Sequence, residues 1–149
     1  MVPEAAREVA ENDDRFRGKS RDEMDRQLFQ DEIFEMQKKM MESAHFVDGD
    51  FVFCDRGFAD SVAYYRYNGL RVPEELLAWT SRFRTTAFIL DSLDKNEYDS
   101  LRTESPEQRI EIHNEIIRAY NEFKYPIIYV PKMSVAERAN FVLEKVKNL

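Results

Sequence analysis

An aspartate and an arginine stand side by side at Asp55-Arg56, directly after the apolar run 51–54 and before a stretch with helical spacing. A carboxylate at such a point can hold a hydrated Mg²⁺, and the neighbouring guanidinium can bind a phosphate through two parallel hydrogen bonds. In an equally weighted structural interpretation, Asp55 caps the following helix and Arg56 pairs with a surface carboxylate. The pair by itself leaves both interpretations open.

The segment between residues 91 and 105 is long, polar and dense in charge. Its carboxylates and arginine are Asp91, Asp94, Glu97, Asp99, Arg102 and Glu104, and Arg109 follows one helical turn further on. Long loops at the carboxyl end of a sheet often act as lids, so Arg102 and Arg109 could close over phosphate groups. Runs of charge are usually solvated surface, and from the residues alone an acidic loop with locally balanced arginines is the preferred interpretation.

The tripeptide Gly18-Lys19-Ser20 matches the end of the phosphate-loop pattern G-x-x-x-x-G-K-[ST]. The position of the first glycine is Asp13, whose carboxylate would lie where a phosphate should bind. The preceding residues also have the pattern of a helix and a polar loop, whereas the motif requires a strand before it. We interpret the match as chance.

Composition limits the class of protein. The chain has 149 residues, 43% hydrophobic and 34% charged, which fits one globular domain. A net charge of −7, without a run of lysine or arginine, argues against nucleic acid as a partner. The single cysteine, Cys54, fits a reducing compartment, and the sequence has neither a signal-peptide pattern nor an apolar run of membrane-spanning length. We therefore expect a soluble cytoplasmic protein with no membrane partner.

Three apolar runs, 51–54, 86–90 and 127–130, are nearly continuous, which is typical of strands buried on both faces of a parallel sheet. Helical spacing lies between and around them. Capping signals predict helix starts at Ser20, Ser105 and Ser134, and further helices are predicted after Pro3, at 59–68 and at 73–82. The order of elements predicts an α/β fold with a parallel sheet, with Asp55 and Asp91 at one edge.

Three stretches together resemble the AAA_28 group of P-loop NTPases. They are Val2-Pro3-Glu4-Ala5-Ala6-Arg7, Phe53-Cys54-Asp55-Arg56-Gly57-Phe58-Ala59-Asp60-Ser61, and the region from Leu90-Asp91 through Arg102, Glu104, Arg109 and His113 to Val130-Pro131. The group is similar to the ribosylnicotinamide kinase domain of the NAD-biosynthesis regulator, and more distantly to thymidylate and deoxynucleoside kinases. The resemblance covers nearly the whole chain, and the D-R-G-x-x-D segment is its most specific part.

The resemblance implies a three-layer P-loop kinase-type fold that binds ATP and Mg²⁺ and acts on a small phosphate acceptor. Under it, Asp55 and Arg56 would serve the metal and the acceptor as catalytic residues. The predicted acceptor-site residues are Glu4, Arg7 and Asp60, and the predicted lid arginines, on the ATP side, are Arg102 and Arg109.

The chain departs from that family at its start. Members begin with a strand, a glycine-rich phosphate loop, a helix and a second strand, and this chain starts where the second strand ends. We therefore expect residues 1–149 to form a single, incomplete kinase-like domain, which would be inert without the phosphate loop. The alternative is a non-catalytic module that holds a phosphorylated ligand or completes its sheet with a partner chain. Because the central strand is missing, we expect 51–55 and 86–90 to pair directly, or a neighbouring chain to fill the gap and form a homo-oligomer.

Overall fold

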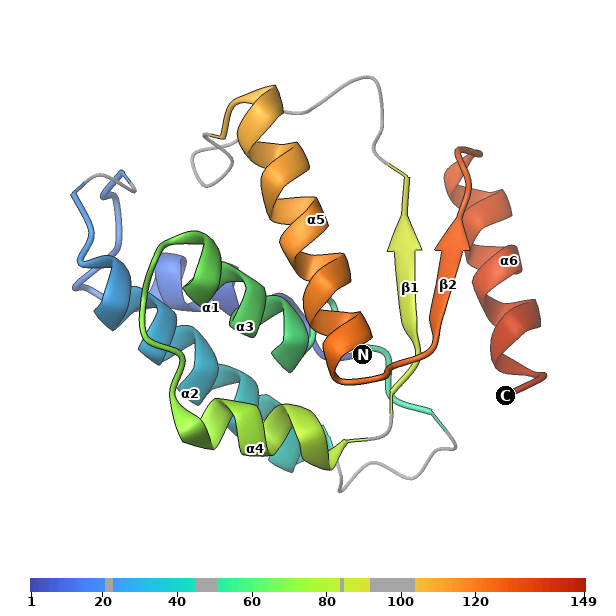
Figure 1. Ribbon diagram of the computed structural model, residues 1–149, viewed down its shortest axis with the longest axis horizontal. Helices are drawn as coiled ribbons and strands as arrows, with labels where there is room; N and C mark the ends of the chain where they lie inside the picture. The colour runs from blue at the N-terminus through green and yellow to red at the C-terminus, as the bar shows by residue number, and fades with distance from the viewer. Residues whose placement is uncertain (21–22, 45–50, 84, 92–103) are drawn as a thin grey trace.

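The computed structural model describes residues 1–20, 23–44, 51–83, 85–91 and 104–149 (Figure 1). Mixed helices and strands form the chain in the order α1 (Ala5–Asn12), α2 (Arg26–Ala44), α3 (Phe58–Tyr67), α4 (Glu74–Arg82), β1 (Ala87–Leu90), α5 (Pro106–Glu122), β2 (Ile127–Val130) and α6 (Val135–Val146). Within these ranges, no helix combines the length and the apolar character that crossing a membrane would require.

The sheet consists of β1 and β2, which pair in parallel from Ala87 opposite Ile127 to Leu90 opposite Val130. Parallel pairing of these two runs confirms the sequence prediction. It follows from the connection, because α5 carries the chain back along the sheet before β2 begins.

The third predicted strand, 51–55, is reduced to a single parallel bridge between Cys54 and Val2. The Val2 N–H donates to the Phe53 carbonyl at 2.7 Å, and the Asp55 N–H donates to the Val2 carbonyl at 2.9 Å. Only one residue of the partner segment takes part, so the ladder does not extend, and Phe51 and Val52 are 53% and 44% exposed. Among the described residues no backbone hydrogen bond joins 51–55 to β1, so the expected direct pairing is not seen. The prediction of three strands in one sheet is therefore wrong at 51–55.

Two of the three predicted capping boxes start helices. At α5 the Gln108 N–H donates to the Ser105 Oγ at 3.2 Å, while the Ser105 N–H donates to the Gln108 side chain at 2.8 Å. At α6, Ser134 and Glu137 make the same reciprocal pair at 3.3 and 2.8 Å. These contacts satisfy N–H groups that have no partner inside the helix, which is why the pattern predicts a helix start.

The helix start predicted at Ser20 is wrong. The Glu23 carboxylate accepts from the Ser20 N–H at 2.8 Å and from its hydroxyl at 2.7 Å, but residues 23–25 are not helical. Helix α2 begins at Arg26, where the Asp25 carboxylate accepts from the Leu28 N–H at 3.0 Å. Asp25 thus takes the capping role that the pattern assigned to Ser20.

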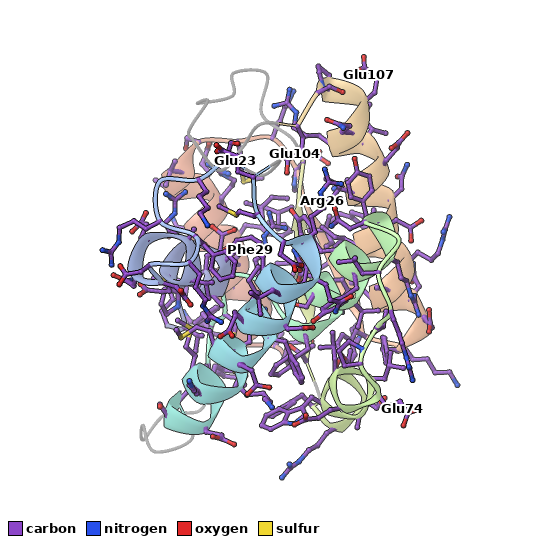
Figure 2. The ribbon with its side chains drawn as sticks, turned by 90° about the vertical axis from the view of Figure 1, so that its left-hand side faces the viewer. Glu23, Arg26, Phe29, Glu74, Glu104 and Glu107 are labelled. Carbon is purple, nitrogen blue, oxygen red and sulfur yellow. The ribbon has the colours of Figure 1, made fainter. Side chains whose placement is uncertain are left out.

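Two apolar cores hold helices α1 to α5 together. The larger one joins α2, α3, α4, β1 and α5, and Val62, Tyr65 and Leu76 in it are 0% exposed. The smaller one lies between α1 and α2, where Phe16 meets Phe29 edge to face at 5.1 Å. Figure 2 shows Phe29 on the side of α2 that faces α1. These cores place the start of α3 against both α2 and α5.

Candidate functional site

The turn Arg56-Gly57 links the bridged segment to α3 and has an unusual backbone. Arg56 adopts φ +77°, the left-handed region that residues with a side chain seldom occupy. Lys124 also has a positive φ, 58°, but it follows the end of α5, where that conformation closes the helix. There the Lys124 and Tyr125 N–H groups donate to carbonyls of the last turn, both at 3.0 Å. Arg56 stands before a helix, so its conformation depends on tertiary contacts.

The Asp60 carboxylate provides the main contacts of this turn. The side chain is at the third position of α3, and the residue is 6% exposed. It accepts from the Gly57 N–H at 2.9 Å, from the Tyr120 hydroxyl at 2.5 Å and from Arg56 Nη1 at 3.2 Å. A buried carboxylate needs such donors to offset the loss of water.

Arg56 lies between two carboxylates, Asp60 and Glu4. Its Nε is 3.9 Å from the Glu4 Oε1, and its side chain remains 38% exposed. Desolvation lowers the pKa of Arg56, but the charges of Asp60, Tyr64 and Glu4 raise it by more, so the net pKa lies above its ordinary value. Because Arg56 is always positively charged and part of its side chain is exposed, it is the group in this turn that can bind an anion.

Tyr120 of α5 reaches the same turn through its hydroxyl group. Burial raises the pKa of its phenol, and the nearby Asp60 carboxylate raises it further. The hydroxyl therefore stays protonated and can donate. From α2, the Gln37 amide donates to the Gly57 carbonyl at 3.4 Å and accepts from the Ser61 hydroxyl at 2.8 Å. Three helices thus hold one short turn.

The sequence model of a family described as an AAA domain, AAA_28, matches residues 1–138. The chain belongs to this family. No curated protein and no solved structure shows a significant match to it. AAA_28 is a family of P-loop NTPase type, and proteins of that type in general use a nucleotide with Mg²⁺.

The structure of this AAA_28 chain brings together three residues that the resemblance placed in the site. Glu4, which precedes α1, lies beside Arg56, and Arg56 contacts Asp60. Arg7 lies one turn further along α1, where it forms an exposed ion pair with Glu11 at 3.5 Å. The Glu4–Arg56–Asp60 contact supports a shared role for these residues, and their role in substrate binding remains a prediction.

Asp55 is exposed, and its backbone N–H is used in the bridge to Val2. In the described part of the chain, no group of three or more His, Cys, Asp or Glu side chains could hold a metal ion. A role for Asp55 on a metal thus stays a prediction. Asp55 and Asp91 also do not follow strands of a common sheet here, because the sheet contains β1 and β2.

Of the two predicted lid arginines, Arg109 lies away from this turn, and Arg102 lies outside the residues that the structure describes. Arg102 falls among residues 92–103, outside the described ranges. Arg109 is in the first turn of α5, and Tyr120 is eleven residues further along, a rise of about 16 Å. Arg109 is therefore not part of the cluster around Arg56, and its action on a nucleotide remains a prediction.

Sequence reasoning missed Tyr120 and Gln37. Neither residue is among the site residues predicted from the sequence. A usable signal existed for Tyr120, because a buried phenol needs a partner for its hydroxyl, and Asp60 is the one acidic residue of α3. Nothing in the sequence, however, says that these two partners meet.

Proposed function

We propose that this AAA_28 chain forms the acceptor and lid portion of an ATP-dependent kinase or NTPase acting on a nucleoside- or nucleotide-type substrate, on a fold of the three-layer P-loop kinase type. The observation that carries the proposal is the Arg56 cation, held in a strained turn between Glu4 and Asp60 with part of its side chain open to solvent. Strained backbone at a charged residue is typical of functional sites.

Six of the seven predicted site residues have a direct role in this proposal. Arg56 binds a phosphate or developing anion on the acceptor side, and Asp55 contributes to the metal. Glu4 and Arg7 line the acceptor pocket. Arg102 and Arg109 approach the ATP phosphates from the lid, which places opposite charge next to the transferred group.

The 149 residues contain no sequence that fits a phosphate-binding loop for the nucleotide. We therefore propose that these residues by themselves do not catalyse phosphoryl transfer. The Ser20 N–H and hydroxyl both donate to Glu23, so a carboxylate occupies the place that a phosphate would take at a functional G-K-S sequence. Among the described residues, the next helix after Gly18-Lys19-Ser20 is α2, which begins only at Arg26, so its N-terminus does not directly follow the tripeptide as it does in a phosphate loop.

The test is a titration of the chain with inorganic phosphate, in which NMR spectroscopy detects binding. We expect weak, millimolar binding to the wild-type chain, since one partly exposed arginine provides most of the attraction. Arg56→Ala should weaken binding about tenfold, the loss expected for one charge-assisted contact. Arg118→Ala is the matched control, because Arg118 is 68% exposed and pairs with Glu115. Equal affinity in wild type and Arg56→Ala would refute the proposal.

A second candidate function is a non-catalytic module that completes its sheet with another copy of the chain. Two observations support it. Within the described ranges, β1 pairs with β2 along one edge, so its other edge has no strand partner. In addition, the side chains of 51–53 are exposed beside a bridge that does not extend into a strand. Such edges associate readily, and a lysine placed in them prevents it. We expect association in sedimentation equilibrium that Phe53→Lys weakens. A wild-type monomer at all concentrations would exclude this candidate.

A further inference from the structure

We propose that Asp60 and Tyr120 are positioning residues: they hold the Arg56 guanidinium and its left-handed backbone in place and do not contact the substrate themselves. This inference rests on the proposed function, in which Arg56 is the anion-binding group. It gives Asp60 a different role from the substrate contact that the family resemblance implies. It also adds Tyr120, a residue that the resemblance does not include.

The contacts of the Asp60 carboxylate support this role. One oxygen accepts from both the Gly57 N–H and the Tyr120 hydroxyl, and the other accepts from Arg56. All three donors belong to the protein, and the residue is 6% exposed. A substrate would therefore have to displace an internal donor to reach Asp60, whereas Arg56 is already accessible.

The backbone of Arg56 gives a second, independent argument. A left-handed arginine is costly unless surrounding contacts impose it. Asp60 imposes it from both sides, because the same carboxylate binds the Arg56 side chain and the N–H of the next residue, Gly57. Tyr120 in turn holds Asp60, and so α5 is coupled to the conformation of Arg56 through one hydrogen bond.

Gly57 shows how closely Tyr120 must approach. A Cβ at this position would lie 2.9 Å from the Tyr120 hydroxyl oxygen and 3.8 Å from the Asp60 carboxylate. The backbone of Gly57, at φ −116° and ψ 178°, is extended and open to any residue. The glycine is thus required by the neighbouring phenol and not by its own conformation, which indicates that the approach of Tyr120 to this turn is a specific feature of the site.

The test compares Tyr120→Phe with Tyr125→Phe. Both variants remove one phenolic hydroxyl from neighbouring rings, whose centroids are 5.6 Å apart. The Tyr125 hydroxyl, however, donates to the Thr80 carbonyl and not to Asp60. Two readouts are taken: the NMR signal of the Arg56 Nε–H, assigned by its absence in Arg56→Ala, and the affinity for inorganic phosphate. A purely structural role would lower stability in both variants and would not single out Arg56.

We expect Tyr120→Phe to broaden the Arg56 Nε–H signal or speed its exchange, and to weaken phosphate binding about 3- to 10-fold, the effect of losing one buried hydrogen bond. Tyr125→Phe should leave both readouts at their wild-type values. Unchanged readouts in Tyr120→Phe, or equal changes in the two variants, would overturn the proposal. If Tyr120→Phe does not fold, Asp60→Asn, which keeps the side-chain shape, is read in the same way.

Failure of the proposed function gives a different result. In that case the wild-type chain and Arg56→Ala bind phosphate equally, or neither binds it. The positioning role is then decided by the Arg56 Nε–H signal alone: a change confined to Tyr120→Phe supports it, and an unchanged signal overturns it.

Discussion

Helices α5 and α6 begin in the same way and end in very different surroundings. Each starts at a serine capping box, and each carries an apolar stripe at helical spacing. On α5 the stripe is buried, with Ile112, Ile116 and Tyr120 between 5% and 7% exposed. On α6, by contrast, Val135 and Leu143 are 73% and 49% exposed, and Val146 is the buried residue of the helix.

Capping and amphipathicity are thus local properties, whereas burial needs a second surface. Helix α5 packs along α3, whereas α6 lies beside β2 at the edge of the two-stranded sheet (Figure 1). Within the described part of the chain, the stripe on α6 therefore has less to pack against than the stripe on α5. The site shares this dependence, because the Tyr120 hydroxyl reaches the Asp60 carboxylate only when α5 is packed against α3.

The largest expected effect separates the two helices directly. Ile116→Ala on α5 should lower the free energy of unfolding by about 2–5 kcal/mol, because it leaves a cavity in the main core. Leu143→Ala on α6 should cost less than about 1 kcal/mol, since its side chain is already half exposed. Urea denaturation measures both. Equal losses would show that α6 is as well packed as α5 and would remove the contrast.

A smaller loss is expected at the turn. Gly57→Ala should destabilise the chain by about 1–3 kcal/mol, because the added methyl group would collide with the Tyr120 hydroxyl. The double variant Gly57→Ala/Tyr120→Phe removes the colliding oxygen, so the two effects should not add. Chemical denaturation of the four proteins of this cycle gives the coupling. Additive effects would mean that the phenol and the glycine are independent.

The next largest effect is the contribution of Tyr120 to the pH dependence of the free energy of unfolding. Its phenol has an unfolded pKa of about 10, and burial together with Asp60 raises the folded pKa. The stabilisation is then complete below about pH 10 and is lost as the pH rises from there toward the folded pKa, by up to about 1.4 kcal/mol per pH unit.

Tyr120→Phe should flatten that alkaline decline in denaturation experiments between pH 8 and 11. Burial also raises the pKa values of Tyr65 and Tyr125, so part of the decline persists in the variant. A profile identical to that of the wild type would show that Tyr120 ionises as freely in the folded chain as in the unfolded one.

The smallest effect is expected at Lys19. We predict that the 149-residue chain binds ATP with Mg²⁺ no more tightly than about millimolar, since a few exposed contacts of about 1 kcal/mol each fall far short of micromolar binding. Lys19→Ala should change nothing in a calorimetric titration. Micromolar affinity that Lys19→Ala abolishes would instead identify Gly18-Lys19-Ser20 as a nonstandard phosphate site.

Local features of the sequence predicted the helices well. Ser105 and Ser134 start α5 and α6 because their side chains meet N–H groups three residues away, a contact that needs no other part of the chain. The pairing of β1 with β2 was predictable from two apolar runs and a helix between them. At Ser20 the same local signal failed, because Glu23 closed a turn and Asp25 capped the helix.

The site was predictable only in its residue types. The residues alone indicate that Asp55-Arg56-Gly57 follows an apolar run and that Asp60 lies near the start of a helix predicted at 59–68. The tertiary structure decided that 51–55 forms a bridge instead of a strand, that α6 stays exposed, and that Tyr120 reaches Asp60 across sixty positions of the chain. These features differ in how far apart in the sequence the interacting residues lie. A helix cap or a periodic apolar stripe depends on neighbours within about one helical turn, whereas a buried carboxylate takes its hydrogen-bond donors from whichever elements pack around it.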